Sequence, residues 1–358
     1  MFKRICAIPL LAFSLSSQAA VISLDFDQSQ FVGEQGAEAQ SAFLEAASFW
    51  ETTLLDSVEI FIDINYTQLA STVIGSANST RSYFNYSAVL DALAEDITSD
   101  EDATAVNATT CSSTAGVCQL AFMEDNGDGG EIDNDGTADN NVIAMTSANA
   151  KALGLEVDEG VDATITFNSD FAFDYDRSDG ISSNMMDFVG VAIHEIGHVL
   201  GFISGVDIVD ENPDLVLDPY AYVSTFDLFR YSDESASAGV IDMRSGVESF
   251  FSIDGGVTET APLSTGRHTG DGQQASHFED HGGEGIMDPT FSYGELGVVR
   301  DNDLLAFDVI GWDLISAEED AGDVATEVSE PHTQVVLLSG LLGMFLMRRR
   351  KSAKTVKA

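Results

Sequence analysis

The pentapeptide His194-Glu195-Ile196-Gly197-His198 constrains the fold of this chain more than any other feature. It lies inside an apolar stretch, residues 184–200, whose spacing predicts one long helix. Two histidines four positions apart project from one helix face and can hold a single Zn²⁺ ion. Glu195 lies beside them, where its carboxylate can take a proton from an attacking water. Because the flanking residues are apolar, we expect this helix to be buried.

A catalytic zinc site needs a third protein ligand besides His194 and His198, together with one open position. Metzincins with a compact zinc motif place a histidine or an aspartate three residues after the glycine that follows the helix. Ser204 stands at that position, so the compact motif is absent. The residue types leave four candidates, Asp207, His268, His277 and His281. The residue types favour a histidine, but they do not choose among the three.

Two further segments resemble the leishmanolysin-type metzincins. Residues 275–278 (Ala-Ser-His-Phe) are similar to the sequence around the third zinc histidine of that family, and residues 285–289 (Gly-Ile-Met-Asp-Pro) are similar to its Met-turn. The resemblance implies that His277 is the third ligand and that Met287 packs beneath the metal without binding it. Asp207 is the alternative third ligand, as in zinc proteases that use an aspartate.

The chain is also similar to exported bacterial zinc proteases that carry PEP-CTERM-like tails. Residues 194–202, 227–230 and 310–313 carry this likeness. The resemblance implies an α/β (α+β) fold of the two-lobed, metzincin-like kind over residues 21–315. The N-lobe, residues 21–201, would combine a twisted sheet with helices. The C-lobe, residues 202–315, would be rich in loops.

Hydrophobic periodicity predicts the elements of this domain. Alternation predicts strands at residues 21–26, 58–66 and 163–167. Helical spacing predicts helices at residues 42–55, 83–97, 149–155, 184–200 and 302–310. Ser182 or Ser183 is the expected N-cap of the helix at 184–200, and Gly201 is its expected end. We expect the strand at 163–167 to border the cleft and to bind substrate by strand addition.

Both ends of the chain have the pattern of sorting signals. Residues 1–20 join a basic start to a short apolar stretch and small residues, which predicts a signal peptide and export by the Sec route. An acidic linker, residues 316–330, precedes a C-terminal segment, residues 331–358. As a helix, its apolar part would span about 20 Å, which is short of the hydrocarbon core of a bilayer.

This C-terminal layout resembles PEP-CTERM sorting tails. The resemblance implies an envelope sorting protease that acts on the tail, and a transient membrane segment. The protein would then reside at the cell surface or outside the cell. A permanent tail anchor is the alternative.

Cysteine usage agrees with export. Removal of the signal peptide takes away Cys6 and leaves Cys111 and Cys118. Two cysteines in an exported chain predict one disulfide, which would close a short loop.

Residues 125–140 form an acidic, glycine-rich segment in which Asp133, Asp135 and Asp139 surround Gly136. Oxygen ligands at such spacing can wrap a hard cation, so Ca²⁺ is a second candidate cofactor beside Zn²⁺. A solvated acidic loop is the alternative interpretation.

The chain carries 60 acidic and 15 basic side chains, for a formal net charge of −45. This charge argues against nucleic acid as a partner, because phosphate needs Lys and Arg to replace its counterions. Together with the histidine motif, the sequence predicts a secreted zinc endopeptidase that acts on proteins or peptides, with Glu195 as general base. Tyr293 is a candidate to stabilise the oxyanion. A non-catalytic surface adhesin or structural protein on a metalloprotease-like fold is the alternative.

Overall fold

Four strands form the main sheet, in the order β1 (Val21–Phe26), β2 (Glu59–Thr67), β10 (Ala163–Asn168) and β3 (Gly75–Ser79). The computed structural model describes residues 19–114, 117–125, 129–280 and 283–315. Strands β1, β2 and β10 run parallel, whereas β3 pairs antiparallel with β10 at one edge. Alternate residues of β2 are buried, which places one face of this strand in the core.

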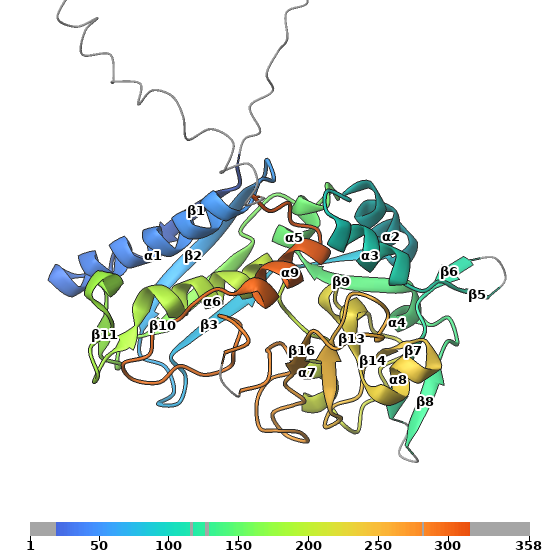
Figure 1. Ribbon diagram of the computed structural model, residues 1–358. Helices are drawn as coiled ribbons and strands as arrows, with labels where there is room; N and C mark the ends of the chain where they lie inside the picture. Colours follow the sequence, from blue (N-terminus) through green and yellow to red (C-terminus); the bar gives the residue numbers. More distant parts are fainter. Residues whose placement is uncertain (1–18, 115–116, 126–128, 281–282, 316–358) are drawn as a thin grey trace, which may run out of the picture. The chain divides into compact units, whose positions relative to one another are not determined.

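Two long helices pack side by side in this core, α1 (Gly33–Thr53) and α6 (Phe188–Leu200) (Figure 1). The ring of Phe43 on α1 lies 4.7 Å from that of Phe167 on β10 and 5.0 Å from that of Phe188 on α6. The indole N–H of Trp50 donates to the carbonyl of Ile193 at 3.1 Å. These contacts fix α6, which carries the histidine motif, against α1 and the sheet.

Shorter elements complete the described part of the chain. Before α6 lie β4 (Arg81–Asn85), α2 (Tyr86–Glu95), α3 (Asp100–Ala108), β5 (Ser112–Thr114), β6 (Val117–Gln119), β7 (Phe122–Asp125), β8 (Gly130–Asp133), α4 (Ala138–Asn141), β9 (Val142–Thr146), α5 (Ser147–Ala152), β11 (Phe173–Asp174) and β12 (Met186–Asp187). After it lie α7 (Val206–Glu211), β13 (Arg230–Tyr231), α8 (Asp233–Ala238), β14 (Ile241–Asp242), β15 (Ser249–Phe251), β16 (Ala261–Leu263) and α9 (Asp301–Val309). Their strands pair as β4–β9, β5–β6, β11–β12, β13–β15–β16 and β14–β7–β8.

The mixed α/β class predicted from the sequence is confirmed, and the strand at residues 21–26 has the predicted bounds. The helix predicted at 83–97 is wrong at its start, because residues 81–85 form β4 and pair with β9. The predicted helix at 42–55 begins nine residues earlier, at Gly33. Long connections follow α6, as predicted.

The N-terminus of α6 also differs from the prediction. The helix begins at Phe188, and its N-cap is Asp187 rather than Ser182 or Ser183. The Asp187 carboxylate accepts a hydrogen bond from the backbone amide of Gly190 at 2.9 Å. The preceding residues pair as β12 with β11, which keeps them out of the helix.

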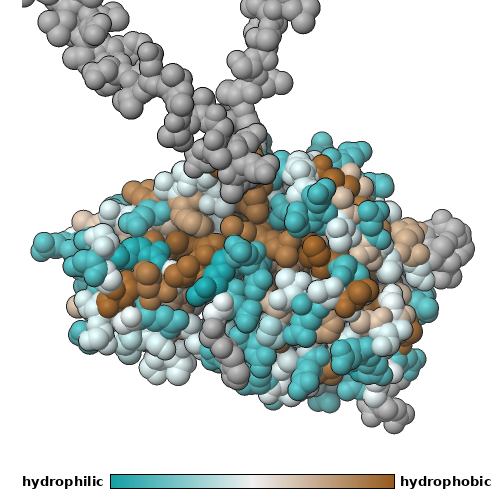
Figure 2. Space-filling view, viewed as in Figure 1, coloured by the Kyte–Doolittle hydropathy of each residue, from teal (hydrophilic) through white to brown (hydrophobic). Residues whose placement is uncertain are grey.

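The last described residues return to the end of α1. Leu314 forms a bridge with Leu54, and the amide of Ile315 donates to the carbonyl of Thr53 at 3.0 Å. The predicted signal peptide up to residue 18, the acidic linker and the C-terminal segment lie outside the described residues. Within the part that is described, no helix combines the length and apolarity needed to cross a bilayer. Figure 2 shows an apolar band across one face, bordered by hydrophilic residues.

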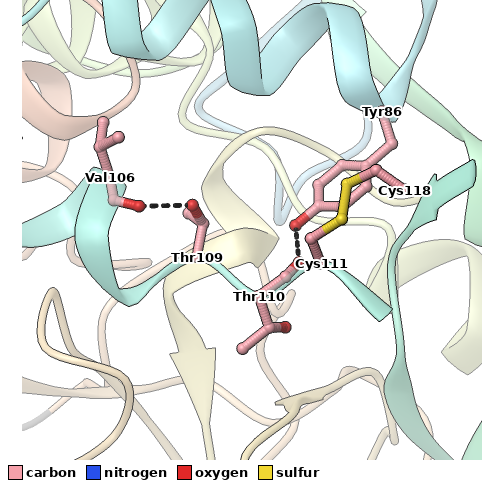
Figure 3. Close-up of a disulfide and its surroundings, with 6 residues drawn as sticks. All are labelled: Tyr86, Val106, Thr109, Thr110, Cys111 and Cys118. Carbon is pink, nitrogen blue, oxygen red and sulfur yellow. Dashed lines mark hydrogen bonds between the residues drawn. A yellow bond between two sulfur atoms is a disulfide. The ribbon is translucent and has the colours of Figure 1, made fainter. Parts of the chain in front are cut away.

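Cys111 and Cys118 lie at disulfide distance, as predicted, with their Cα atoms 5.1 Å apart (Figure 3). The pair joins the two sides of the β5–β6 hairpin. Beside it, the hydroxyl of Tyr86 donates to the carbonyl of Thr110 at 2.6 Å, so the hairpin is also held to α2.

Candidate functional site

Three histidines from two distant parts of the chain meet beside α6. His194 and His198 lie one turn apart on α6, and His277 lies in the connection between β16 and α9. The Nε2 atom of His198 is 3.1 Å from the Nε2 atoms of both His194 and His277. His194 and His277 are buried, and His198 is half-buried. The structure therefore brings together the histidines that the motif and the resemblance singled out.

Each of these imidazole rings uses its other nitrogen, Nδ1, on a backbone carbonyl. The Nδ1 atom of His194 lies 2.7 Å from the carbonyl oxygen of Ile286, and that of His198 lies 2.7 Å from the carbonyl oxygen of Phe202. The Nδ1 atom of His277 lies 3.1 Å from the carbonyl oxygen of Gln274. A carbonyl only accepts, so Nδ1 carries the proton in each ring. Burial lowers the pKa of His194 to about 3 and that of His198 to about 4, and lowers the pKa of His277. The neutral rings therefore present three unprotonated Nε2 atoms to one another.

Among the described residues, the other candidate ligands do not belong to this histidine group, although Asp207 lines the same cleft. The carboxylate of Asp207 accepts a hydrogen bond from the backbone amide of Ala275 at 2.7 Å, so it holds the segment that leads to His277. Burial raises the pKa of Asp207 to about 6. His268 is exposed. His281 lies outside the described residues.

Glu195 faces the edge strand β3. Its carboxylate receives a hydrogen bond from the backbone amide of Ala77, and burial raises its pKa to about 8. A Cβ atom added to Gly75 would lie 2.8 Å from the Oε1 atom of Glu195. Gly75 therefore leaves the space that the carboxylate occupies.

A cleft of about 680 Å³ opens over the histidines and Glu195. Residues 72–79, which include β3, form one wall, and residues 203–211 and 272–277 contribute to the other. No strand in the described part of the chain pairs with the outer side of β3. Arg81 and Arg267 also line the cleft, and neither forms an ion pair within the described residues. The cleft can therefore receive an extended chain along β3.

The predicted substrate strand is wrong. Residues 163–167 belong to β10, which is paired by β2 on one side and β3 on the other, so it has no free edge. β3 was not predicted, because Gly-Ser-Ala-Asn-Ser lacks apolar alternation. Tyr293 is 53% exposed and is not among the residues that line the cleft, so its predicted oxyanion role is not supported.

Met287 is fully buried against α6. A Cβ atom added to Gly197 would lie 2.6 Å from the Sδ atom of Met287, so the missing side chain at Gly197 makes room for the sulfur. The carboxylate of Asp303 on α9 accepts hydrogen bonds from the backbone amides of Ile286 at 2.7 Å and Met287 at 3.0 Å. Because the carbonyl of Ile286 accepts from His194, the turn at Met287 also orients a histidine.

Two buried residues that sequence reasoning left without a role hold the end of α6. The carboxylate of Asp227 accepts hydrogen bonds from the hydroxyl of Ser204 at 2.6 Å and the amide of Gly205 at 2.7 Å. The indole N–H of Trp312 donates to the carbonyl of Leu200 at 2.8 Å. Both belong to segments that carried the family resemblance. That resemblance, together with polar groups in apolar surroundings, was the signal for them in the sequence.

A second group of ligand-type side chains lies outside the cleft lining. One carboxylate oxygen from each of Asp133, Asp135 and Asp139 lies within 4.8 Å of the others. The structure thus brings together the three residues that the sequence suggested for calcium.

Comparison with known proteins found no matching family model, no matching curated protein and no matching solved structure. The family resemblances therefore remain expectations. The geometry of the site and the chemistry of its residues are what indicate a function for this chain.

Proposed function

We propose that this protein is an exported zinc-dependent endopeptidase that hydrolyses peptide bonds in protein or peptide substrates. The Nε2 atoms of His194, His198 and His277 would hold the metal, with the fourth position open. Met287 would support this site by packing, without binding the metal.

The observation that carries this proposal is the meeting of three unprotonated nitrogens. Each Nδ1 atom bears its proton toward a carbonyl, so no proton is available between the Nε2 atoms. The lone pair of His198 lies 3.1 Å from those of His194 and His277, and such lone pairs repel one another unless a cation lies between them. Nitrogen ligands around tetrahedral Zn²⁺, at the usual bond length, lie roughly 3.3 Å apart. The donor set therefore fits this ion.

The carbonyl partners of the three rings support the same proposal. Metal-ligating histidines commonly donate the other ring N–H to a carbonyl or carboxylate, which fixes both the tautomer and the ring orientation. All three rings have this arrangement here. Two histidines buried only for structural reasons would not require a third ring, from a distant loop, to donate its Nδ1 proton to a carbonyl as well.

Zinc held at this point supplies a Lewis acid that polarises a carbonyl and lowers the pKa of water. Glu195 accepts the proton of the attacking water and passes it to the leaving amine. The raised pKa of Glu195, about 8, comes from burial. A neighbouring positive charge favours the ionised carboxylate and lowers that pKa toward the range of a working base.

The edge strand β3 supports an extended substrate. Apart from the amide of Ala77, which donates to Glu195, the backbone groups on its outer side can pair with a peptide in the cleft, which would lay the peptide past Glu195. We infer that the chain is two-lobed in the metzincin manner, with the β3 wall contributed by residues 21–201 and the opposite wall by residues 202–315. Export to the cell surface or medium is part of the proposal, and the predicted disulfide accords with it.

The test measures zinc content and casein cleavage on one preparation each of wild type, Glu195→Gln and Glu45→Gln. Glu45 lies exposed on α1 and serves as the matched control. We expect equimolar zinc in all three proteins, with cleavage reduced by about 10²-fold or more in Glu195→Gln alone. Zinc without cleavage in the wild type would favour the adhesin alternative. Absence of zinc from the wild type would refute the proposed metal site.

A further inference from the structure

The acidic group formed by Asp133, Asp135 and Asp139 has the geometry of a cation site. Asp133 ends β8, Asp135 lies in the following loop, and Asp139 lies on α4. One oxygen from each lies within 4.8 Å of the others. Two oxygens bound to the same Ca²⁺ ion are at most about 5 Å apart, because each Ca–O bond is about 2.3–2.6 Å long.

Asp139 gives an independent indication of a missing ligand. Its side chain is fully buried, yet its Oδ2 atom has no hydrogen-bond partner within the described structure. Its Oδ1 atom, in contrast, accepts hydrogen bonds from the hydroxyl of Thr137 at 2.6 Å and the amide of Asn140 at 3.0 Å. An orphaned buried carboxylate oxygen is costly, and such atoms are normally satisfied by protein, water or an ion.

The surroundings of the group add negative charge. Burial raises the pKa of Glu124 on β7 to about 7, and the nearby charges of Asp133, Asp218 and Asp139 raise it further. Within the described residues, none of the three aspartates of the group forms an ion pair with Lys or Arg. Hydrogen bonds from Asp135, Thr137 and Asn140 reach these carboxylates, but no basic side chain of the described residues offsets the repulsion among them.

We propose that Asp133, Asp135 and Asp139 bind a Ca²⁺ ion. All three donors are carboxylate oxygens, which suit a hard cation and do not suit the nitrogen- and sulfur-preferring metals. Ca²⁺ accepts an irregular set of oxygen ligands, whereas Mg²⁺ demands near-octahedral geometry and keeps most of its water. The exported location proposed above would expose the site to calcium, but the argument from the three carboxylates is independent of the zinc site.

The ion would join two segments whose carboxylates otherwise repel one another, those of Asp133 and Asp139 on one side and that of Asp218 on the other. The backbone amide of Ala138, at the start of α4, donates to the carbonyl of Asp218 at 2.9 Å, so the group lies where the loop after β8 meets the loop after α7. A cation there neutralises both sides of this junction. We therefore expect calcium to stabilise the fold, by mass action on the native state.

The test uses the full-length protein, stripped of calcium and kept in micromolar zinc, with Ca²⁺ as the probe and Mg²⁺ as the comparison. Thermal unfolding midpoints and calcium titrations are recorded for wild type, Asp139→Asn, Asp135→Asn and Asp158→Asn. Asp158 is exposed in the loop after α5 and controls for the loss of one charge. Asp135 is also exposed, so Asp135→Asn keeps the test valid if Asp139→Asn fails to fold.

We expect calcium to raise the midpoint of the wild type and Asp158→Asn. In Asp139→Asn and Asp135→Asn, calcium affinity should fall by at least about tenfold. Without calcium, Asp139→Asn should be at least as stable as the wild type, because one repelling charge is gone, and with calcium the order should reverse. The proposal is overturned if the wild type shows no saturable response, if both variants respond like the wild type, or if Mg²⁺ binds equally well. The proposal is also overturned if Asp139→Asn is destabilised by the same amount with and without calcium.

Discussion

The carboxylate of Asp303 accepts a hydrogen bond from the backbone amide of Met287 at 3.0 Å, which ties α9 to the turn beneath the histidines. The same carboxylate accepts from Ile286, whose carbonyl accepts from His194. One buried aspartate on α9 thus orients a candidate ligand through a single intervening residue. Gly285 is necessary here, because a Cβ atom at that position would overlap the carboxylate.

Asp303→Asn should loosen this turn and weaken zinc binding. Asparagine keeps one acceptor oxygen but turns an amide toward a backbone N–H. We expect zinc affinity to fall by roughly 10- to 100-fold, as for other outer-shell partners of zinc ligands. Competition with a chromophoric chelator measures this. Asp301→Asn, on the exposed first turn of α9, is the matched control. Equal affinity in both variants would contradict the orienting role of Asp303.

His277→Ala and Asp207→Asn separate the two candidate third ligands. If His277 is the ligand, its removal abolishes stoichiometric zinc and casein cleavage. Asp207→Asn should retain zinc, because its remaining oxygen can still accept from Ala275. Metal analysis after gel filtration gives the answer. Zinc retained in His277→Ala and lost in Asp207→Asn would reverse the assignment.

Gly75→Ala should damage catalysis while leaving the metal bound. The added methyl group would lie 2.8 Å from Oε1 of Glu195 and would displace the carboxylate. Misplacement of a general base should reduce kcat by about 10²-fold with equimolar zinc retained. Ser76→Ala, on the opposite, exposed face of β3, serves as the control. A normal kcat in the Gly75→Ala protein would show that Glu195 acts without the space that Gly75 leaves for its carboxylate.

Arg81→Gln should change substrate preference. Arg81 lines the cleft, its Nη1 atom is buried without a partner, and it forms no ion pair within the described residues. We expect kcat/KM to fall roughly three- to tenfold for peptides with an acidic side chain near the scissile bond. A matched neutral peptide, cleaved equally by both proteins, is the internal control. An equal loss on both peptides would indicate a structural role instead.

Asp96→Asn should stabilise the protein in a pH-dependent way. Burial raises the pKa of Asp96 to about 8, and the nearby charges of Asp313 and Asp56 raise it further. The unfolded carboxyl has a pKa of about 3.9, so the native state binds more protons between these values. The stability of the wild type therefore falls as pH rises from about 4 to 8.

The asparagine variant lacks this titration. Its advantage in unfolding free energy should be small near pH 4 and should grow to a plateau at about pH 8. Solvent screening of the half-buried group keeps the gain modest. Urea unfolding at several pH values measures it, with Asp91→Asn on the exposed face of α2 as control. A difference between Asp96→Asn and wild type that is independent of pH would contradict the raised pKa.

The parts of the fold that the sequence predicted are those stabilised by their own local pattern. β2 alternates clearly, β1 alternates weakly and α6 is strongly apolar, so the sequence predicted the type of each of these elements. The sequence did not predict β3 and β4, because these strands form by pairing with β10 and β9 rather than from the preferences of their own residues. The start of α6 was misplaced because Asp187 caps the helix from within an apolar stretch.

The residues of the candidate site also divide into those that the local sequence predicted and those that only the fold brings into place. His194, Glu195 and His198 form a contiguous motif whose chemistry follows from helix geometry. His277 lies 79 positions away from His198, and the residues alone did not distinguish it from His268 and His281; only the family resemblance favoured it. The role of Asp303 could not be predicted, because it acts through backbone amides of a turn whose proximity only the fold creates.

The bond between Trp312 and the carbonyl of Leu200 spans 112 positions of the sequence. Synthesis proceeds from the N-terminus, so α6 emerges long before the residue that secures its end. His277, Asp303 and Trp312 must all be present before the three histidines can be held together. A chain whose synthesis has not yet reached Trp312 therefore carries the motif without the assembled site. For the zinc peptidase proposed above, the order of synthesis would delay hydrolysis until these residues have emerged.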